Sequence, residues 1–217
     1  MNKSELAAFI DHTLLKPEAV SDDIERLCRE TVQYGFASVC VNPIWVQSAS
    51  VILKGFEPFV CSVIGFPLGA TNSMASEAAE AVDNGASELD MVLPVGYLKS
   101  GYTGKTADLI SDVVHASSGM PVKVIIETCL LTDEEKTLAC RISLDSGASW
   151  VKTSTGFSSG GATTADVILM KRAVGDKLGV KASGGIRTLK DALAMINAGA
   201  RRLGCSRSVE IVESLDA

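Results

Sequence analysis

The sequence lacks the features of membrane, secreted and zinc-binding proteins. Its apolar runs are far too short to cross a bilayer, and the amino terminus, Met1–Leu6, carries no apolar signal core. Its six cysteines are scattered without a C-x-x-C pair, which is typical of reduced thiols rather than of disulfides or zinc ligands. We therefore expect a cytoplasmic protein with no membrane partner.

Histidine and positive charge are also scarce. The two histidines, His12 and His115, are too few for a histidine-rich metal site, so we expect no metal. A net charge of −6 argues against a general nucleic-acid binder. No linker or low-complexity stretch divides the chain, and 217 residues that are 47% hydrophobic suffice for one full core. The expected organisation is a single domain over residues 1–217.

One helix-to-strand junction recurs along the chain. A helix-like segment ends on a glycine, which can adopt the left-handed cap conformation, and a small or apolar residue and then a strand-like run follow. The four copies are centred on Gly35, Gly85, Gly147 and Gly199. Helix-like segments such as Asp22–Cys28 and Ser76–Val82 separate the strands, as in a series of βα units.

The number of strand-like runs favours a closed barrel. The eight runs are Phe9–His12, Val39–Asn42, Val60–Phe66, Glu88–Leu93, Val122–Thr128, Trp150–Ser154, Val180–Ser183 and Arg202–Cys205. Eight alternating βα units in one domain predict an α/β fold of the (β/α)8 TIM-barrel type. A doubly wound open sheet is the alternative, because the first and last runs are short.

Polar residues recur on one face of several of these strands. Parallel strands that are covered on both faces normally read as continuous aliphatic runs. Here Val122–Glu127 places Lys123 and Glu127 on one face, where Glu127 would neutralise Lys123. The same alternation applies to the strand runs that hold Cys40 and Asn42, Glu88 and Asp90, Lys152, and Lys181. In a barrel these side chains would converge in the lumen, either as an ion-pair network that fills the interior or as a functional site.

Two lysines in this set suggest amine chemistry. Lys152 and Lys181 each lie in a strand-like run that ends near a glycine. A buried ammonium is costly unless it is paired or loses its proton, and a neutral lysine attacks carbonyl carbon. A protonated Lys181 would disfavour a second ammonium at Lys152, so the pair could form a Schiff base.

Glycine-bearing strand ends suggest a phosphate site. Thr155-Gly156, Ser183–Arg187 and Leu203–Ser206 can each present backbone N–H groups. The last two follow the seventh and eighth strands, where barrels often bind phosphate. Arg187 could add charge, whereas Lys16 is expected to be solvated.

At these residues the chain resembles the 2-deoxyribose-5-phosphate aldolase family, the class I, Schiff-base aldolases with a TIM barrel. The resemblance covers nearly the whole chain, and its motifs are Ile10–Pro17, Val39–Pro43, Gly65–Gly69, Glu88–Gly96, Val122–Thr128, Val151–Phe157 and Lys181–Thr188. It implies reversible cleavage of 2-deoxy-D-ribose 5-phosphate into acetaldehyde and D-glyceraldehyde 3-phosphate. No cofactor is implied, since the iminium supplies the polarisation, and a homodimer is a candidate assembly.

The resemblance also implies roles for individual residues. Lys152 would be the Schiff-base lysine, Lys181 the second lysine that perturbs it, and Asp90 a proton-relay acid. The substrate-binding positions that it implies, together with the glycine loops above, are Asp11, Cys40, Lys123, Thr155, Gly156, Gly184, Gly185, Gly204 and Ser206.

The chain departs from the family at two places. Arg207 stands where a second serine usually follows Ser206, so only Ser206 is carried over. Some members have a tail tyrosine that reaches the site, and Val212–Ala217 contains none. Two other functions stay open at this stage: a phosphosugar isomerase whose lysines only balance substrate charge, and a sugar-phosphate sensor without turnover.

Overall fold

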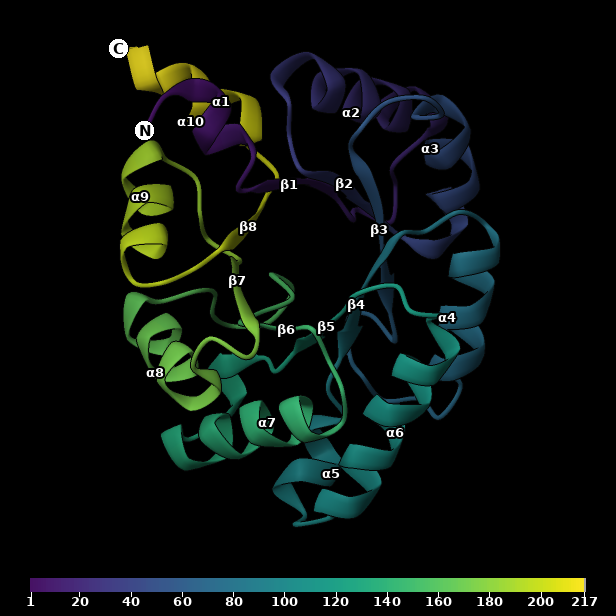
Figure 1. The fold of residues 1–217 in the computed structure, drawn as a ribbon, viewed down its shortest axis with the longest axis vertical. Helices are drawn as coiled ribbons and strands as arrows, with labels where there is room; N and C mark the ends of the chain where they lie inside the picture. The colour runs from purple at the N-terminus through teal and green to yellow at the C-terminus, as the bar shows by residue number, and fades with distance from the viewer. Residues whose placement is uncertain (217) are drawn as a thin grey trace.

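The computed structural model describes residues 1–216, which form a closed barrel of eight parallel strands (Figure 1). The strands are β1 (Ile10–Leu14), β2 (Ser38–Val41), β3 (Phe59–Ile64), β4 (Glu88–Val92), β5 (Val122–Ile125), β6 (Trp150–Lys152), β7 (Gly179–Ser183) and β8 (Arg202–Cys205). Each strand pairs with its sequence neighbour, and β1 pairs with β8 through Ile10 opposite Leu203. This closure confirms the TIM barrel and rules out the open sheet.

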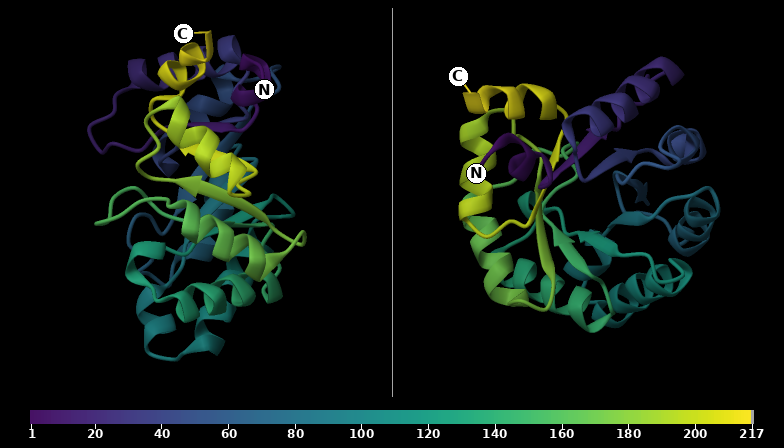
Figure 2. Two further views of the ribbon diagram at one scale, coloured as in Figure 1. Left: turned by 90° about the vertical axis from the view of Figure 1, so that its left-hand side faces the viewer. Right: turned by 45° about the horizontal axis from the view of Figure 1, so that its top comes forward.

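A helix follows each strand and packs around the barrel (Figures 1 and 2). These helices are α2 (Ser21–Tyr34), α3 (Val46–Ile52), α4 (Met74–Asp83), α6 (Thr103–Ala116), α7 (Asp133–Asp145), α8 (Thr164–Val174), α9 (Leu189–Asn197) and α10 (Ser208–Glu213). The other helices are α1 (Lys3–Ala7), which precedes β1, α5 (Val95–Lys99), which precedes α6, and three 3₁₀ turns, η1 (Pro43–Trp45), η2 (Thr128–Leu130) and η3 (Ser214–Asp216). Within the described residues, no helix has the length and apolar character needed to cross a membrane.

The local signals in the sequence explain where helices start and stop. The glycine at each of the four helix-to-strand junctions has a positive φ, between +72° at Gly35 and +111° at Gly199. Gly35 caps α2 in the left-handed conformation, and its N–H donates to the Thr31 carbonyl. At the start of α7, Thr132 and Glu135 form a reciprocal capping box, which satisfies backbone N–H groups of the first turn.

The alternation of residues along the strands divides the side chains into two groups, an aliphatic one that faces the helices and a polar one that faces the lumen. The outward-facing aliphatic residues are fully buried against the helices; they include Val39, Val41, Leu89, Met91, Val124, Val151 and Val180. The inward-facing positions of the same strands carry the polar residues. The predicted division of faces is therefore confirmed, and the main hydrophobic core lies between the sheet and the helices.

Gly179 leaves room for the Trp150 indole at the amino-terminal end of the barrel. The two residues are direct neighbours across β6 and β7. A Cβ at position 179 would lie 2.0 Å from a carbon of the Trp150 ring. Because Gly179 has an ordinary φ, the obstacle to a larger residue is this clash and not backbone strain.

We expect Gly179→Ala to destabilise the protein by about 1–3 kcal/mol, since the rigid, half-buried indole must move to make room. Gly104→Ala is the matched control, because that glycine lies in α6 with nothing within 4 Å of a new Cβ. It should leave stability unchanged or raise it by up to about 1 kcal/mol. Urea unfolding midpoints at constant slope measure both changes. Equal midpoints for the two variants would refute the steric explanation.

Candidate active site

Seven charged side chains meet inside the barrel, and we call them the interior charge cluster. They are the cations Lys123, Lys152, Lys181 and Arg202 and the carboxylates Asp11, Glu88 and Asp90. They come from β1, β4, β5, β6, β7 and β8, and each projects inward because of its position in the strand. The predicted convergence of lysines and carboxylates in the lumen is therefore observed.

Asp90 lies at the centre of this cluster. Its Oδ2 accepts hydrogen bonds from Lys152 Nζ at 2.8 Å and from Lys181 Nζ at 2.7 Å. Its Oδ1 lies 3.2 Å from Lys123 Nζ. Lys152 and Lys181 are also direct neighbours across β6 and β7. The two lysines therefore share one oxygen atom, which holds their nitrogens close together.

The remaining members form ion pairs around this centre. Lys181 Nζ lies 2.5 Å from Asp11 Oδ2, and Arg202 Nη1 lies 2.6 Å from Asp11 Oδ1. Lys123 Nζ contacts Glu88 Oε2 at 2.7 Å, and that oxygen lies 3.5 Å from Arg202. Each buried charge therefore has an opposite charge beside it, as burial requires.

The pKa values of the buried groups follow from these contacts. Burial by itself lowers the pKa of Lys181, but Asp11 and Asp90 outweigh it and hold the pKa well above its usual range. Burial by itself raises the pKa of Asp90, but Lys123, Lys152 and Lys181 hold it well below its usual range. At neutral pH Lys181 is therefore an ammonium and Asp90 a carboxylate.

A cavity of about 300 Å³ opens above the interior charge cluster. Its wall includes Lys152, Thr155, Gly156, Ser183, Gly184, Gly185, Gly204 and Ser206, with Lys16 and Arg187 also contributing. The wall therefore contains the phosphate-binding candidates together with Lys152. Lys123, Lys181 and the three carboxylates are buried beneath it and are not part of the wall. Of the buried lysines in residues 1–216, only Lys152 reaches this cavity.

Two glycines allow the loops around the cavity to approach closely. The loop after β6 crosses the loop after β7, where Ala162 N–H donates to the Ser183 and Gly184 carbonyl oxygens at 3.1 and 3.0 Å. A Cβ on Gly161 would lie 2.3 Å from the Gly184 carbonyl oxygen. A Cβ on Gly204 would lie 3.3 Å from Lys181 Cε and 2.9 Å from Ser183 Cβ, so Gly204 also makes room for the Lys181 stem.

Some parts of the site differ from the sequence-based predictions. Glu127 does not pair with Lys123: β5 ends at Ile125, Glu127 has a left-handed φ of +54°, and its carboxylate accepts a hydrogen bond from Thr155 Oγ1 at 2.5 Å. Asn42 also lies outside the cluster, where its amide donates to the Leu15 carbonyl oxygen at 3.2 Å. Strand alternation fails at these positions because each lies beyond the end of its strand.

Three members of the site were not singled out from the sequence: Arg202, Cys61 and Lys16. Arg202 has the inward parity of Gly204 in the predicted last strand, so the alternation could have identified it. Cys61 is followed by Ser62, and two adjacent polar residues leave the facing of β3 ambiguous. Lys16 lies in the loop after β1, where alternation gives no information.

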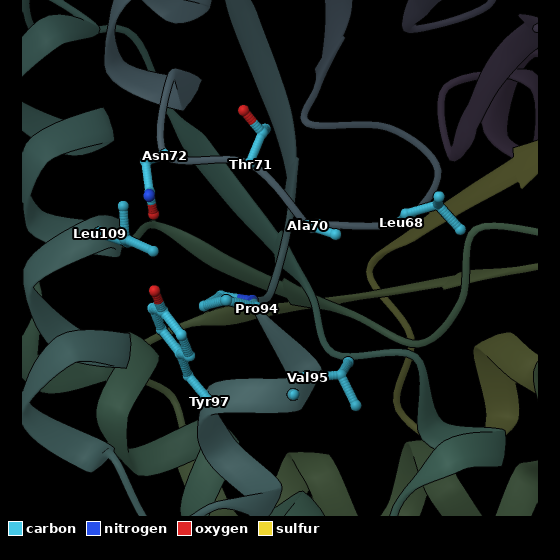
Figure 3. A pocket seen from close by; sticks show the side chains of 10 residues that line it. Leu68, Ala70, Thr71, Asn72, Pro94, Val95, Tyr97 and Leu109 are labelled. Carbon is cyan, nitrogen blue, oxygen red and sulfur yellow. The ribbon is translucent and has the colours of Figure 1, made fainter.

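A second cavity of about 300 Å³ lies away from this chemistry (Figure 3). Leu68–Asn72, Pro94–Tyr97 and Leu109 line it, between the loop after β3 and the helices α5 and α6. None of these described lining residues is charged, and none offers a nucleophile comparable to Lys152. The candidate active site is therefore the cavity over Lys152.

Comparison with known proteins agrees with this geometry. Residues 6–209 match the model of the DeoC/LacD family aldolases. The chain belongs to the DeoC/LacD aldolase family. A deoxyribose-phosphate aldolase from Clostridium kluyveri is 56% identical, with 98% of this chain and 99% of that protein covered. One from Lysinibacillus sphaericus is 53% identical, with 99% and 98% covered.

Solved structures of the DeoC/LacD aldolases show the same architecture. The deoxyribose phosphate aldolase from Aeropyrum pernix, described as tetrameric, has a TM-score of 0.93 and 36% identity. The alignment covers all of this chain and 93% of the Aeropyrum chain. The barrel with its interior charge cluster therefore occurs in a chain of aldolase ancestry.

Replacement of Asp11 should show how strongly an unbalanced charge inside the barrel destabilises the protein. Asp11→Asn leaves Lys181 and Arg202 without their shared carboxylate, and we expect a loss of about 3–5 kcal/mol in the free energy of unfolding. Burial alone would raise the pKa of Asp11, but Lys181 and Arg202 hold it below the usual 3.8. The stabilisation is therefore complete above pH 3.8 and is lost as the pH falls below it.

Urea unfolding of wild type and Asp11→Asn across a pH series measures this difference. The difference should be constant near neutral pH and should shrink under acid conditions. Asp176→Asn is the control, because the Asp176 side chain is 99% exposed and pairs only with Lys171 at the surface. A difference in the free energy of unfolding between wild type and Asp11→Asn that grows on acidification would contradict the assigned ion pairs.

Proposed function

We propose that the protein is a class I aldolase that reversibly cleaves 2-deoxy-D-ribose 5-phosphate into acetaldehyde and D-glyceraldehyde 3-phosphate. One observation carries this proposal above the others. Lys152 alone, among the described buried lysines, both lines the cavity and touches the carboxylate that Lys181 shares. This arrangement presents one amine to a carbonyl substrate and keeps a second, charged amine beside it.

The charge count of the interior supports Lys152 as the nucleophile. The interior charge cluster holds four cationic side chains and three carboxylates, so one cation is in excess when all are ionised. Lys123 and Lys181 each contact two carboxylates, whereas Lys152 contacts only Asp90. Lys152 is therefore the lysine of the cluster with the fewest ion pairs, and an amine in its neutral form attacks carbonyl carbon.

The reaction follows from this arrangement. The Lys152 amine adds to the C1 aldehyde, and loss of water from the carbinolamine gives an iminium. The C3 hydroxyl then gives up its proton and the C2–C3 bond breaks, with its electron pair passing into the iminium to form an enamine. Glyceraldehyde 3-phosphate leaves, the enamine carbon takes up a proton, and water releases acetaldehyde from Lys152.

Asp90 would move the protons in these steps, with Lys181 and a water molecule beside it. The Asp90 carboxylate lies against both amines, so it can accept a proton at Oδ2 and return it through a water molecule. Lys181 stays charged throughout, because Asp11 and Asp90 both pair with it. It would therefore stabilise the negative charge that develops on oxygen during carbinolamine formation and cleavage.

The cavity wall suits a phosphate at the far end of the substrate. The described residues that line it include no carboxylate, and they include the glycine loops after β6, β7 and β8. Lys16 and Arg187 stand at the same wall, and Lys16 also acts on the Asp23 carboxylate. Backbone N–H groups and two cations together favour a phosphate dianion. The substrate-binding roles of Asp11, Cys40 and Lys123 stay predictions, since these residues lie beneath the wall.

Borohydride reduction with acetaldehyde tests the Schiff base. Wild type should lose activity and gain the mass of an N-ethyl group on the peptide that contains Lys152. Lys152→Ala should abolish both the labelling and the release of glyceraldehyde 3-phosphate from deoxyribose phosphate in a coupled assay. Lys177→Ala, at an exposed lysine, is the control and should behave as wild type.

The outcomes separate the rival functions. A phosphosugar isomerase would be untouched by borohydride and acetaldehyde, and a sensor would show no turnover for Lys152→Ala to remove. A label on Lys181 in place of Lys152 would reverse the assigned roles of the two lysines.

A second test concerns the phosphate. Lys16→Gln and Arg187→Gln should each raise the KM for deoxyribose phosphate by about 10-fold, since each removes one charge-assisted contact. The kcat/KM for unphosphorylated deoxyribose should stay near wild type, because that substrate has no group for these cations. Lys177→Gln serves as the charge-matched control. An equal loss of kcat/KM with both substrates would show that the phosphate does not bind at this end of the cavity.

The assembly and location are carried as predictions. A homodimer, small phosphorylated sugar and aldehyde substrates as partners, and a cytoplasmic location are consistent with the proposed activity. Size-exclusion chromatography with light scattering measures the first directly.

A further inference from the structure

Cys61 lies at the boundary between the interior charge cluster and a small apolar cluster. It projects inward from the middle of β3 and is fully buried. On one side it packs with Leu15, Cys40 and Val63, which form a separate hydrophobic cluster with Phe66 at its edge. On the other side its thiol reaches the carboxylate of Asp90. No step of the reaction described above uses this thiol.

The contacts of Asp90 divide between its two oxygens. Oδ2 accepts from Lys152 and Lys181, the two amines of the proposed reaction. Oδ1 accepts from the Cys61 thiol at 3.2 Å and lies 3.2 Å from Lys123 Nζ. Cys61 Sγ also lies 3.6 Å from Lys123 Nζ. One oxygen therefore faces the chemistry, and the other is held by groups that do not touch the cavity.

We propose that Cys61 is a positioning residue that holds Asp90 Oδ1, so that Oδ2 stays aligned with Lys152 and Lys181 during proton transfer. This inference rests on the proposed function, because it assigns Asp90 as the proton carrier. A carboxylate with only Oδ2 contacts could rotate about its Cβ–Cγ bond. Two contacts on Oδ1 fix the plane of the group in the ground state and after Oδ2 is protonated.

The sheet keeps this contact in place. Cys61 pairs with Glu88 across β3 and β4, and Val63 pairs with Asp90. Cys61 and Asp90 are therefore diagonal neighbours on adjacent strands rather than residues of mobile loops. Substrate entry from the cavity side does not need to disturb them.

A thiol suits this position for two physical reasons. Apart from the Cys40 thiol, its neighbours in the small cluster are aliphatic or aromatic, and sulfur packs well among such groups. It is also a weak donor, so it orients the carboxylate without removing much of its basicity. Burial, Cys40 and Asp90 raise the pKa of Cys61 well above its usual value, so the S–H donor persists over the working range of pH.

Two half-reactions with acetaldehyde test the role of Cys61. Borohydride trapping reports the Lys152 amine, and uptake of deuterium into the acetaldehyde methyl group in D₂O, followed by NMR, reports proton transfer at the enamine carbon. Cys61→Ala should trap within about twofold of wild type but exchange about 10-fold more slowly, because small misplacements of a catalytic group are costly. Cys61→Ser, which restores a donor, should recover most of the exchange.

Cys140→Ala is the matched control. Cys140 is equally buried but lies on α7, away from the charged cluster, so its replacement creates a similar small cavity. It should match wild type in both assays. Three results would overturn the proposal. The first is a Cys61→Ala exchange rate equal to that of wild type, and the second is an equal loss of exchange in Cys61→Ala and Cys61→Ser. The third is a loss of trapping in Cys61→Ala as large as its loss of exchange. If wild type itself neither traps nor exchanges, the proposed aldolase function fails, and the role of Cys61 fails with it.

Discussion

A single carboxylate oxygen shared by two lysines is the constraint on which the structure of the site depends. Asp90 Oδ2 holds Lys152 and Lys181 at 2.8 and 2.7 Å among side chains that are almost entirely buried. In such surroundings an ammonium without a partner is costly, and two of them beside one oxygen are costlier still. Asp11 and Asp90 keep the charge on Lys181, and Glu88, Lys123 and Arg202 complete the surrounding ion pairs. Lys181 has two carboxylates, and Lys152 has a share of one.

The barrel supplies the stability that the buried charges do not, and it fixes the orientation of their side chains. The aliphatic face of each strand packs against the helices, so stability comes from the outer layer and the lumen is free to hold charges. A lumen filled with aliphatic residues would often be at least as stable as buried ion pairs. The charges are therefore better explained by chemistry than by folding. The closed sheet fixes their register, and the cavity exposes only Lys152 of the buried lysines in the described chain.

The sequence predicts the elements of this account whose physics is local. Glycine at a helix end requires a positive φ, and Gly35, Gly85, Gly147 and Gly199 all have one. Strand alternation places Lys123, Lys152, Lys181 and Asp90 in the lumen, because the pleat fixes their direction. The aldolase family is also evident from the motifs along the chain. The family match and the closed barrel confirm both the fold and the ancestry that these patterns indicate.

What the sequence does not predict depends on where strands end and on contacts between distant segments. Glu127 has the correct parity but follows the last residue of β5, so it turns to Thr155 instead of Lys123. Arg202 and Asp11 are 191 positions apart and meet only because β8 closes on β1. Cys61 is chemically unremarkable in the sequence and becomes informative only beside Asp90. Lys16 lies in the loop after β1, and residue alternation along a strand does not predict the path of a loop.

The central claim is that, of the two amines on Asp90 Oδ2, Lys152 reacts with the carbonyl substrate and Lys181 stays an ammonium. NMR of protein labelled with ¹³C at the lysine ε-carbon, recorded without and with acetaldehyde, measures this directly, with each signal assigned from the Lys152→Arg and Lys181→Arg variants. The account predicts a Lys181 signal that remains that of an ammonium throughout the stable pH range, and a Lys152 signal that moves to that of an imine when acetaldehyde is added. An imine signal at Lys181 beside an unchanged Lys152 signal would contradict it.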